Sequence, residues 1–332
     1  MRHGDRLYSW FVARRQRIKA HKLSFVNSNR AVLYRAVLGI AMVVACRSEK
    51  PRINPDSESV KSGRQTVTGL TSGTGWDSVA GSFVVIPGSD SIDAGIVLPG
   101  LTDSLLASTK QFELDGLQNT ALDLFTLRGF VGSSILHVSS QPADAAGCLT
   151  WPEGRLDGVI PVQWKIGLEA GKASGIKVIP IDATQGKDST TLIADVLDAA
   201  SHLPQGGDAV FKGIPFSVRS AYRLAIPEPS VIVAEVVRKI NEEANPREEH
   251  VLIVAERRST IGAYQLAFHM TSAGAEESLQ TTDLLAAIKV VKTGRLALVV
   301  SFDYEDGGKI GLLEKVSEGM WRLVWKSAYT GC

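Results

Sequence analysis

The chain has 332 residues, of which 44% are hydrophobic and 21% are charged. That much apolar material is enough for a packed core, and the length suggests one to three domains. The composition excludes a disordered polymer, a collagen and a coiled coil. The sequence holds no motif strong enough to assign a catalytic chemistry. We therefore expect no cofactor, and an enzyme is the less favoured interpretation.

The net charge of +1 conceals an asymmetry along the chain. Residues 1–45 hold nine of the 36 Lys and Arg residues but one of the 35 Asp and Glu residues. The remainder therefore holds 27 positive and 34 negative side chains, a net charge of −7. A body of that charge has no general attraction for nucleic acid or for an anionic lipid surface. No run of aromatic residues alternates with Lys and Arg either, so we expect no nucleic-acid partner.

A short apolar segment follows the basic N-terminal residues. Residues 36–45 (AVLGIAMVVA) form an uninterrupted apolar run of ten residues, preceded by Arg30 and Arg35. As a helix this run is about 15 Å long, half the thickness of a bilayer core. It is therefore too short to span a membrane and has the length of a signal-peptide apolar region, so 1–45 is predicted as a signal region. Because 1–29 is long and polar for a signal, we expect the true start near Arg30.

The end of the apolar run, Val43-Val44-Ala45-Cys46, resembles the lipobox of bacterial lipoproteins. The resemblance implies cleavage after Ala45, a diacylglycerol on the Cys46 sulfur and an acyl chain on its amino group. Such chains give stable anchoring, since each buried methylene contributes about 0.8 kcal/mol. The residue after Cys46 is Arg47 rather than Asp, which by the same resemblance implies passage to the outer membrane. The alternative is a buried helix with an incidental cysteine.

Two cysteines remain once Cys46 is assigned to lipid attachment: Cys148 and the last residue, Cys332. An oxidising envelope compartment favours the pairing of an even number of cysteines in an exported chain. We therefore predict a disulfide bond between Cys148 and Cys332. By the chain-entropy estimate this bond stabilises the fold by at most about 5 kcal/mol. Two unpaired thiols are the alternative.

The composition divides the rest of the chain into a tether and a body. Residues 46–75 are rich in Ser, Gly, Thr, Pro and charges without periodicity, which is typical of a flexible tether, here lipidated at its first residue. The body begins near Trp76, with an N-terminal β-rich part over 76–205 that includes a helix and a C-terminal β-meander part over 206–332. We expect the two parts to pack as one unit, because the predicted disulfide joins them.

Most of the body shows the pattern of short antiparallel strands bounded by Gly, Pro and Asp. The predicted strands are 82–86, 95–98, 121–127, 134–138, 162–168, 177–181, 216–226, 231–240, 251–256, 264–271, 284–291, 297–304, 309–315 and 321–326. One segment differs, because Leu192, Val196 and Ala200 recur at helical spacing between Ser189, a candidate N-cap, and Pro204. This predicts an amphipathic helix over about 190–202. The fold class is therefore α+β, mainly antiparallel β with one clear helix.

Residues 283–332 resemble a blade of the FG-GAP or VCBS repeat families. Their pattern is an apolar strand over 284–291, then Thr293-Gly294-Arg295, a stronger strand over 296–302 and a last strand in which Trp321 and Trp325 alternate with polar residues. The resemblance implies a propeller-like or meander sheet at the C-terminus. In those families an Asp-rich loop binds calcium, but residues 290–294 contain no carboxylate, so that function does not carry over. The body shows no repeat of fixed period, so a complete propeller is not expected.

Four residues have the chemistry of metal ligands: Glu248, Glu249, His250 and His269. A zinc site needs at least three convergent ligands, and no short helical spacing joins these four. No metal is therefore predicted, and the four remain the candidates if one binds. The acidic segment 303–308 (DYEDGG) suits either a cation loop or a hairpin turn, and its Asp-Gly-Gly ending favours the turn.

These features favour one function and leave a second open. The leading hypothesis is an envelope-anchored bacterial lipoprotein at the outer membrane, facing the periplasm or the surface. It would be a non-catalytic binding or structural module. Its partners would be the membrane, through the anchor on Cys46, and an envelope protein or polysaccharide. The alternative is a periplasmic or surface hydrolase, with or without a metal, whose residues converge only in space.

Overall fold

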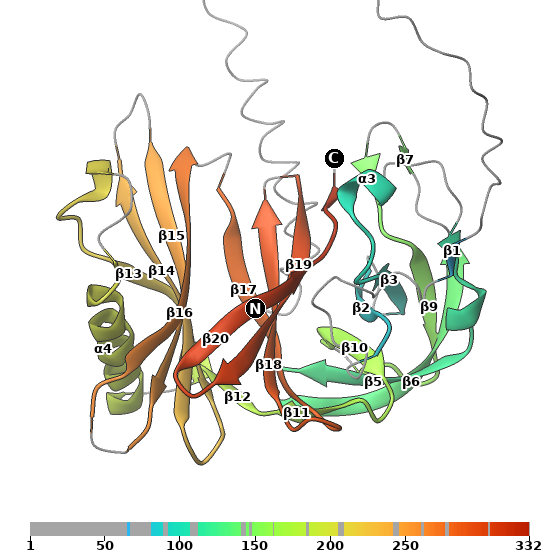
Figure 1. Ribbon diagram of the computed structural model, residues 1–332, viewed down its shortest axis with the longest axis horizontal. Coiled ribbons are helices and arrows are strands. Elements are labelled where there is room, and N and C mark those ends of the chain that lie inside the picture. The colour runs from blue at the N-terminus through green and yellow to red at the C-terminus, as the bar shows by residue number, and fades with distance from the viewer. Residues whose placement is uncertain are drawn as a thin grey trace, which may run out of the picture.

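A computed structural model describes most of the body of the chain (Figure 1). The described residues are 65–66, 81–88, 92–106, 112–140, 144–145, 148–161, 163–183, 186–204, 209–241, 246–259, 262–275, 279–304 and 306–331. The predicted signal region, Cys46 and most of the predicted tether lie outside them. All strand pairs of the described residues are antiparallel except that of β1 (Gln65–Thr66) with β4 (Phe112–Glu113). The predicted class, mainly antiparallel β with one clear helix, is confirmed.

Six strands close into a barrel in the order β10-β2-β3-β9-β6-β5. Buried side chains fill its interior, among them Ile96, Leu122, Leu136 and Ile166. A single helical turn, α3 (Asp103–Leu106), and a 3-10 turn, η3 (Asp115–Leu117), lie in the connections. The bounds of the barrel strands are β2 Val84–Pro87, β3 Asp93–Val97, β5 Thr120–Thr126, β6 Gly129–Ser140, β9 Glu153–Asp157 and β10 Ile166–Glu169.

An eight-stranded sheet, here called the central sheet, lies beside the barrel. Its order is β11-β17-β18-β19-β21-β8-β7, and β20 pairs with β19. Its strands β17 to β20 follow one another as a meander, which is the form observed for the predicted C-terminal sheet. The bounds are β7 Asp144–Ala145, β8 Cys148–Leu149, β11 Ala173–Ile176, β17 Thr281–Val290, β18 Leu296–Tyr304, β19 Gly307–Ser317, β20 Met320–Lys326 and β21 Thr330–Gly331.

A five-stranded sheet, the outer sheet, has the order β12-β13-β14-β15-β16. Its strands are β12 Val178–Pro180, β13 Ser217–Leu224, β14 Ser230–Ile240, β15 Arg247–Arg257 and β16 Gln265–Ala275. The long helix α4 (Lys187–Ser201) covers one face, with 3-10 turns η4 (Ile181–Ala183) and η5 (Ala209–Phe211) on either side in sequence. The helix begins earlier than predicted: Gly186, with φ of 58°, takes the N-cap position in place of Ser189. The predicted apolar stripe of Leu192, Val196 and Ala200 is buried.

Figure 1 shows these parts as successive layers, from α4 through the outer and central sheets to the barrel. Each interface between layers is a hydrophobic core. Strand β14 explains the arrangement: Val231 and Val233 face the central sheet, whereas Ile232 and Ala234 face α4. A strand that is covered on both faces has a continuous apolar sequence, as this one does. The division predicted near residue 205 falls between α4 and the strands on which α4 packs.

The two tryptophans of the last long strand lie on opposite faces of the central sheet. The alternation of residues 321–325 suggests one shared face. In the structure Trp321 packs between the central and outer sheets, whereas Trp325 packs toward the barrel and donates to the Pro99 carbonyl at 2.9 Å. Leu312 of β19 pairs with Trp325 of β20, but the next residue, Leu313, pairs with Leu323, so one residue of β20 is left unpaired and forms a β-bulge. The extra residue reverses the faces, because side chains in a strand alternate.

The acidic segment 303–308 contains a hairpin turn, as its ending suggests. Tyr304 pairs with Gly307, so the turn lies between the ends of β18 and β19. Gly307 also pairs with Gly331 of β21, and a Cβ on Gly307 would lie 2.1 Å from the Thr330 carbonyl oxygen. Glycine is therefore required where the last strand approaches β19.

Candidate functional site

The lipid and disulfide predictions concern residues at the limits of the described chain. Cys46 and Cys332 lie outside the described residues. Cys148 begins β8, and the next residue, Leu149, pairs with Gly331 of β21 in antiparallel fashion. The structure thus brings the backbone around Cys148 next to the residue that precedes Cys332.

The structure does not gather the four candidate metal ligands. Glu248 and His250 meet, with His250 Nε2 2.8 Å from Glu248 Oε2. Glu249 lies between them in the strand, so its side chain points to the other face, where it pairs with Arg238. His269 is exposed and lies opposite Ile253, a residue that faces α4. In the part of the chain that the structure describes, no group of three or more His, Cys, Asp or Glu residues is arranged to hold a metal ion.

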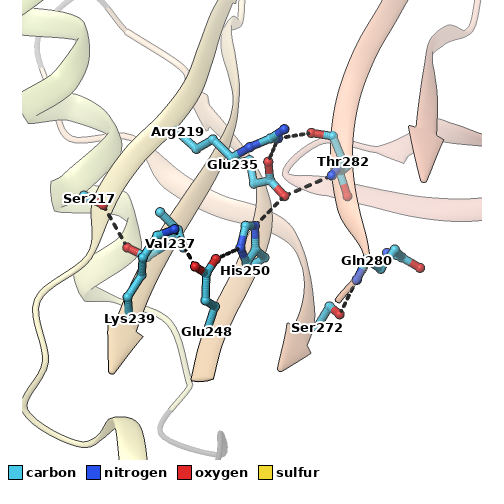
Figure 2. A network of polar contacts seen from close by, with 10 residues as sticks. All are labelled: Ser217, Arg219, Glu235, Val237, Lys239, Glu248, His250, Ser272, Gln280 and Thr282. Carbon is cyan, nitrogen blue, oxygen red and sulfur yellow. Dashed lines mark hydrogen bonds and ion pairs between the residues drawn. The ribbon is translucent and has the colours of Figure 1, made fainter. Parts of the chain in front are cut away.

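A network of polar contacts centres on Glu235, in the middle of β14 (Figure 2). The Glu235 side chain is 1% exposed and forms an ion pair with Arg219 of β13. Its Oε1 accepts a hydrogen bond from the Thr282 amide at 2.9 Å and lies 3.1 Å from His250 Nδ1. Arg219 in turn donates to the Thr282 carbonyl at 3.3 Å. Glu235 therefore links its own strand, β14, to β13 and β15 in the outer sheet and to β17 in the central sheet.

His250 lies between two carboxylates. Burial disfavours its protonated form, but the hydrogen bonds and charges of Glu235 and Glu248 outweigh burial and raise the pKa of His250. Glu248 also pairs with Lys239, and the bonds from Lys239 and His250 outweigh burial and lower the pKa of Glu248. The chain Lys239–Glu248–His250–Glu235–Arg219 thus alternates in charge when His250 is protonated. Figure 2 shows this chain crossing β13, β14 and β15.

A second group of carboxylates lies at the start of β17 and the end of β18, where the charge of Arg219 acts on both. Asp283 of β17 accepts hydrogen bonds from the Tyr222 hydroxyl and from the Leu284 amide. Burial raises the pKa of Asp283 despite the opposing effects of Tyr222 and Arg219. On β18, burial raises the pKa of Asp303 to about 7, against the effect of a hydrogen bond from Ser301 at 3.1 Å.

Glu256 provides another polar link between the outer and central sheets. Its side chain is buried and accepts from Trp321 Nε1 at 2.6 Å and from the Gly319 amide at 3.1 Å. Lys315 Nζ lies 2.7 Å from Glu256 Oε1. These three donors belong to β19, β20 and the turn between them, so Glu256 holds that hairpin against β15.

These contacts define what the polar clusters do chemically. Glu235 and Glu256 each bond to groups on the central sheet and so hold the outer sheet to it, whereas His250 bonds to Glu235 and Glu248 within the outer sheet. Residues that satisfy one another in this way fix the register and packing of sheets. The four candidate metal ligands predicted from the sequence include His250 and Glu248. They do not include the other members of these clusters, which are Arg219, Glu235, Asp283 and Glu256. One signal was present, since Glu235 is a lone charge inside the apolar run VIVAEVV, and a buried charge requires a partner.

The described residues include no helix that is both long and apolar enough to cross a membrane. Comparison of the chain with models of protein families, with curated proteins and with solved structures finds no match. The function is therefore argued from the sequence and the geometry of this chain.

Proposed function

We propose that the protein is a bacterial lipoprotein of the cell envelope, anchored through lipid on Cys46, whose β-rich body is a non-catalytic binding or structural module. The observation that carries the proposal is the lipobox-like Val43-Val44-Ala45-Cys46 at the end of an apolar run of ten residues. The body adds support, because the buried Glu235 and Glu256 bond to groups on neighbouring strands and so hold its sheets together. Its ligand in the envelope would be a protein or a polysaccharide.

Lipidation of Cys46 is tested by Cys46→Ser in the native host. We expect the wild-type chain to incorporate a labelled fatty acid and to sediment with the outer membrane. The variant should incorporate none and should keep the mass of the uncleaved precursor. A Cys148→Ser chain is the matched control and should be lipidated and cleaved as the wild type is. A Cys46→Ser protein that is trimmed normally and recovered in a soluble fraction contradicts the anchor.

The disulfide between Cys148 and Cys332 is part of the same proposal, because it requires an oxidising compartment. Gly331 pairs with Leu149, so the residue that precedes Cys332 in the chain lies opposite the residue that follows Cys148. This register supports the bond.

The disulfide is tested on the mature protein by mass spectrometry without reduction. We expect the two cysteines in one linked peptide pair and no free thiol. Cys332→Ser should lower the free energy of unfolding by about 2–5 kcal/mol, because the bond closes a long loop of the unfolded chain. Alkylation of both thiols in the native, unreduced protein contradicts the bond.

A further inference from the structure

Exposed cations surround β11, the edge strand of the central sheet. Lys172 and Lys177 flank the strand, and both side chains are exposed. Arg128 lies in the turn that joins β5 to β6, and Lys289 and Lys292 lie at the end of β17; these three are exposed as well. Five cations therefore belong to a single edge of a body whose net charge is negative.

Backbone contacts make this edge continuous. At one end of β11, the Val291 amide donates to the Lys172 carbonyl at 3.0 Å. In the middle, Ser174 pairs with Lys289 of β17. At the other end, the Val178 amide donates to the Leu127 carbonyl, which places the β5–β6 turn and its Arg128 next to Lys177.

Three carboxylates on strands close to this edge bond to other groups. Asp123 accepts from the Gly171 amide at 2.8 Å and from Ser133 at 3.0 Å. Glu169 accepts from the Ser82 amide at 2.6 Å. Glu314, on β19, is buried and pairs with Arg295 at 3.4 Å. Among the residues that the structure describes, none of these three acids forms an ion pair with any of the five cations, and the one that does form an ion pair, Glu314, does so with Arg295.

Two apolar side chains protrude beside the cations. Phe130, directly after the β5–β6 turn, is 56% exposed, and Val291, between Lys289 and Lys292, is 58% exposed. Cations that flank exposed aromatic and aliphatic side chains are typical of surfaces that lie at a membrane interface. There the apolar groups enter the headgroup region and the cations bind anionic lipids.

We propose that the β11 edge, formed by Arg128, Phe130, Lys172, Lys177, Lys289, Val291 and Lys292, docks on an anionic phospholipid surface. The proposal rests on the proposed lipid anchor, which would keep the body within reach of a bilayer. The negative net charge of the body does not oppose it, because charges more than about 8 Å away are largely screened at physiological salt. Nucleic acid is less suited to this edge, which offers one exposed aromatic ring and no groove of stacking residues.

The test uses the full lipidated chain inserted into vesicles of phosphatidylcholine alone or with 30% phosphatidylglycerol. Flotation reports anchoring, and amide hydrogen exchange read by mass spectrometry reports docking. We expect the chain to float with both vesicle types. Exchange in peptides covering 127–131, 171–177 and 289–295 should be at least fivefold slower on the anionic vesicles, and 1 M salt should abolish the difference.

The variant Lys172→Gln/Lys292→Gln should remove most of this protection. Each cation near an anionic bilayer strengthens partitioning about fivefold, so loss of two weakens docking about 25-fold. The matched control, Lys212→Gln/Arg322→Gln, removes two exposed cations outside the β11 edge and should keep the protection. Equal thermal midpoints of the two variants show that both are folded, and Arg128→Gln/Lys289→Gln replaces the first variant if its midpoint falls.

The outcomes separate docking from anchoring. A chain that floats with both vesicle types but exchanges equally on both overturns docking and leaves the anchor intact. A chain that binds neither vesicle type overturns both proposals. Protection of the same peptides by a DNA duplex, without protection by anionic vesicles, assigns the β11 edge to nucleic acid and overturns the lipid proposal.

Discussion

Replacement of Glu235 by Ala removes three contacts at once: the ion pair with Arg219, the contact with His250 and the hydrogen bond from the Thr282 amide. Removing one partner of a buried charge pair costs about 3–5 kcal/mol, and an unpaired buried amide costs about 1–3 kcal/mol more. The Arg219 side chain is 36% exposed, so water can solvate part of its charge in the variant. We therefore expect Glu235→Ala to lower the free energy of unfolding by about 4 kcal/mol.

The assay for Glu235→Ala is urea unfolding followed by tryptophan fluorescence, with the transition midpoint and slope compared with those of the wild type. Glu235→Gln keeps an acceptor for the Thr282 amide but loses the charge, so its loss should be smaller, about 2 kcal/mol. Glu318→Gln is the matched control: its side chain is 63% exposed, and the change should be below about 0.5 kcal/mol. A loss below about 1 kcal/mol for Glu235→Ala, with an unchanged slope, refutes the view that Glu235 holds the sheets together.

Three further predictions use the same unfolding assay. The neighbours of His250 raise its pKa, so its contribution to the free energy of unfolding is complete below about pH 6.5 and is lost as the pH rises. The wild-type free energy of unfolding should therefore fall between pH 6 and 9, and His250→Gln should make that fall smaller. Asp303, with a pKa raised to about 7, contributes most below about pH 4 and loses that contribution toward pH 7. Asp303→Asn should therefore stabilise the protein by about 2 kcal/mol at pH 8 and change little at pH 4, and equal effects at the two pH values contradict this assignment. Glu256→Gln weakens the link to Trp321 and Lys315 and should cost about 2 kcal/mol, whereas a neutral result contradicts its role in holding the β19–β20 hairpin.

The fold was largely predictable where a signal is local. The stripe of Leu192, Val196 and Ala200 predicted α4, and the bounded apolar runs predicted the long strands, because each reflects burial of one face at a fixed period. The predictions failed where a single residue changed the period. At Gln163, a φ of 74° breaks the extended backbone, so the strand predicted from 162 begins at Ile166.

The polar clusters were not predictable, because their members come from different strands. Glu235 lies 16 residues from Arg219 and 47 from Thr282, and no local pattern carries such a pairing. A cross-strand contact depends on the register of two strands and on which face each residue occupies. For the same reason Glu248 and Glu249, adjacent in sequence, have different partners, Lys239 and Arg238.

Local sequence patterns were enough to predict the class of fold, the long helix, the hairpin at 303–308 and a lipid anchor at Cys46. Each of these depends on residue types within a few positions of one another, and that is where backbone preferences and signal motifs act. The folded structure was needed to see that the strands form a barrel and two stacked sheets, that Glu235 and Glu256 link those sheets, and that the cations around β11 lie on one edge. The physical reason is that strands far apart in the chain become neighbours through backbone pairing, which any apolar strand can form, so the choice among pairings depends on the packing of the whole body.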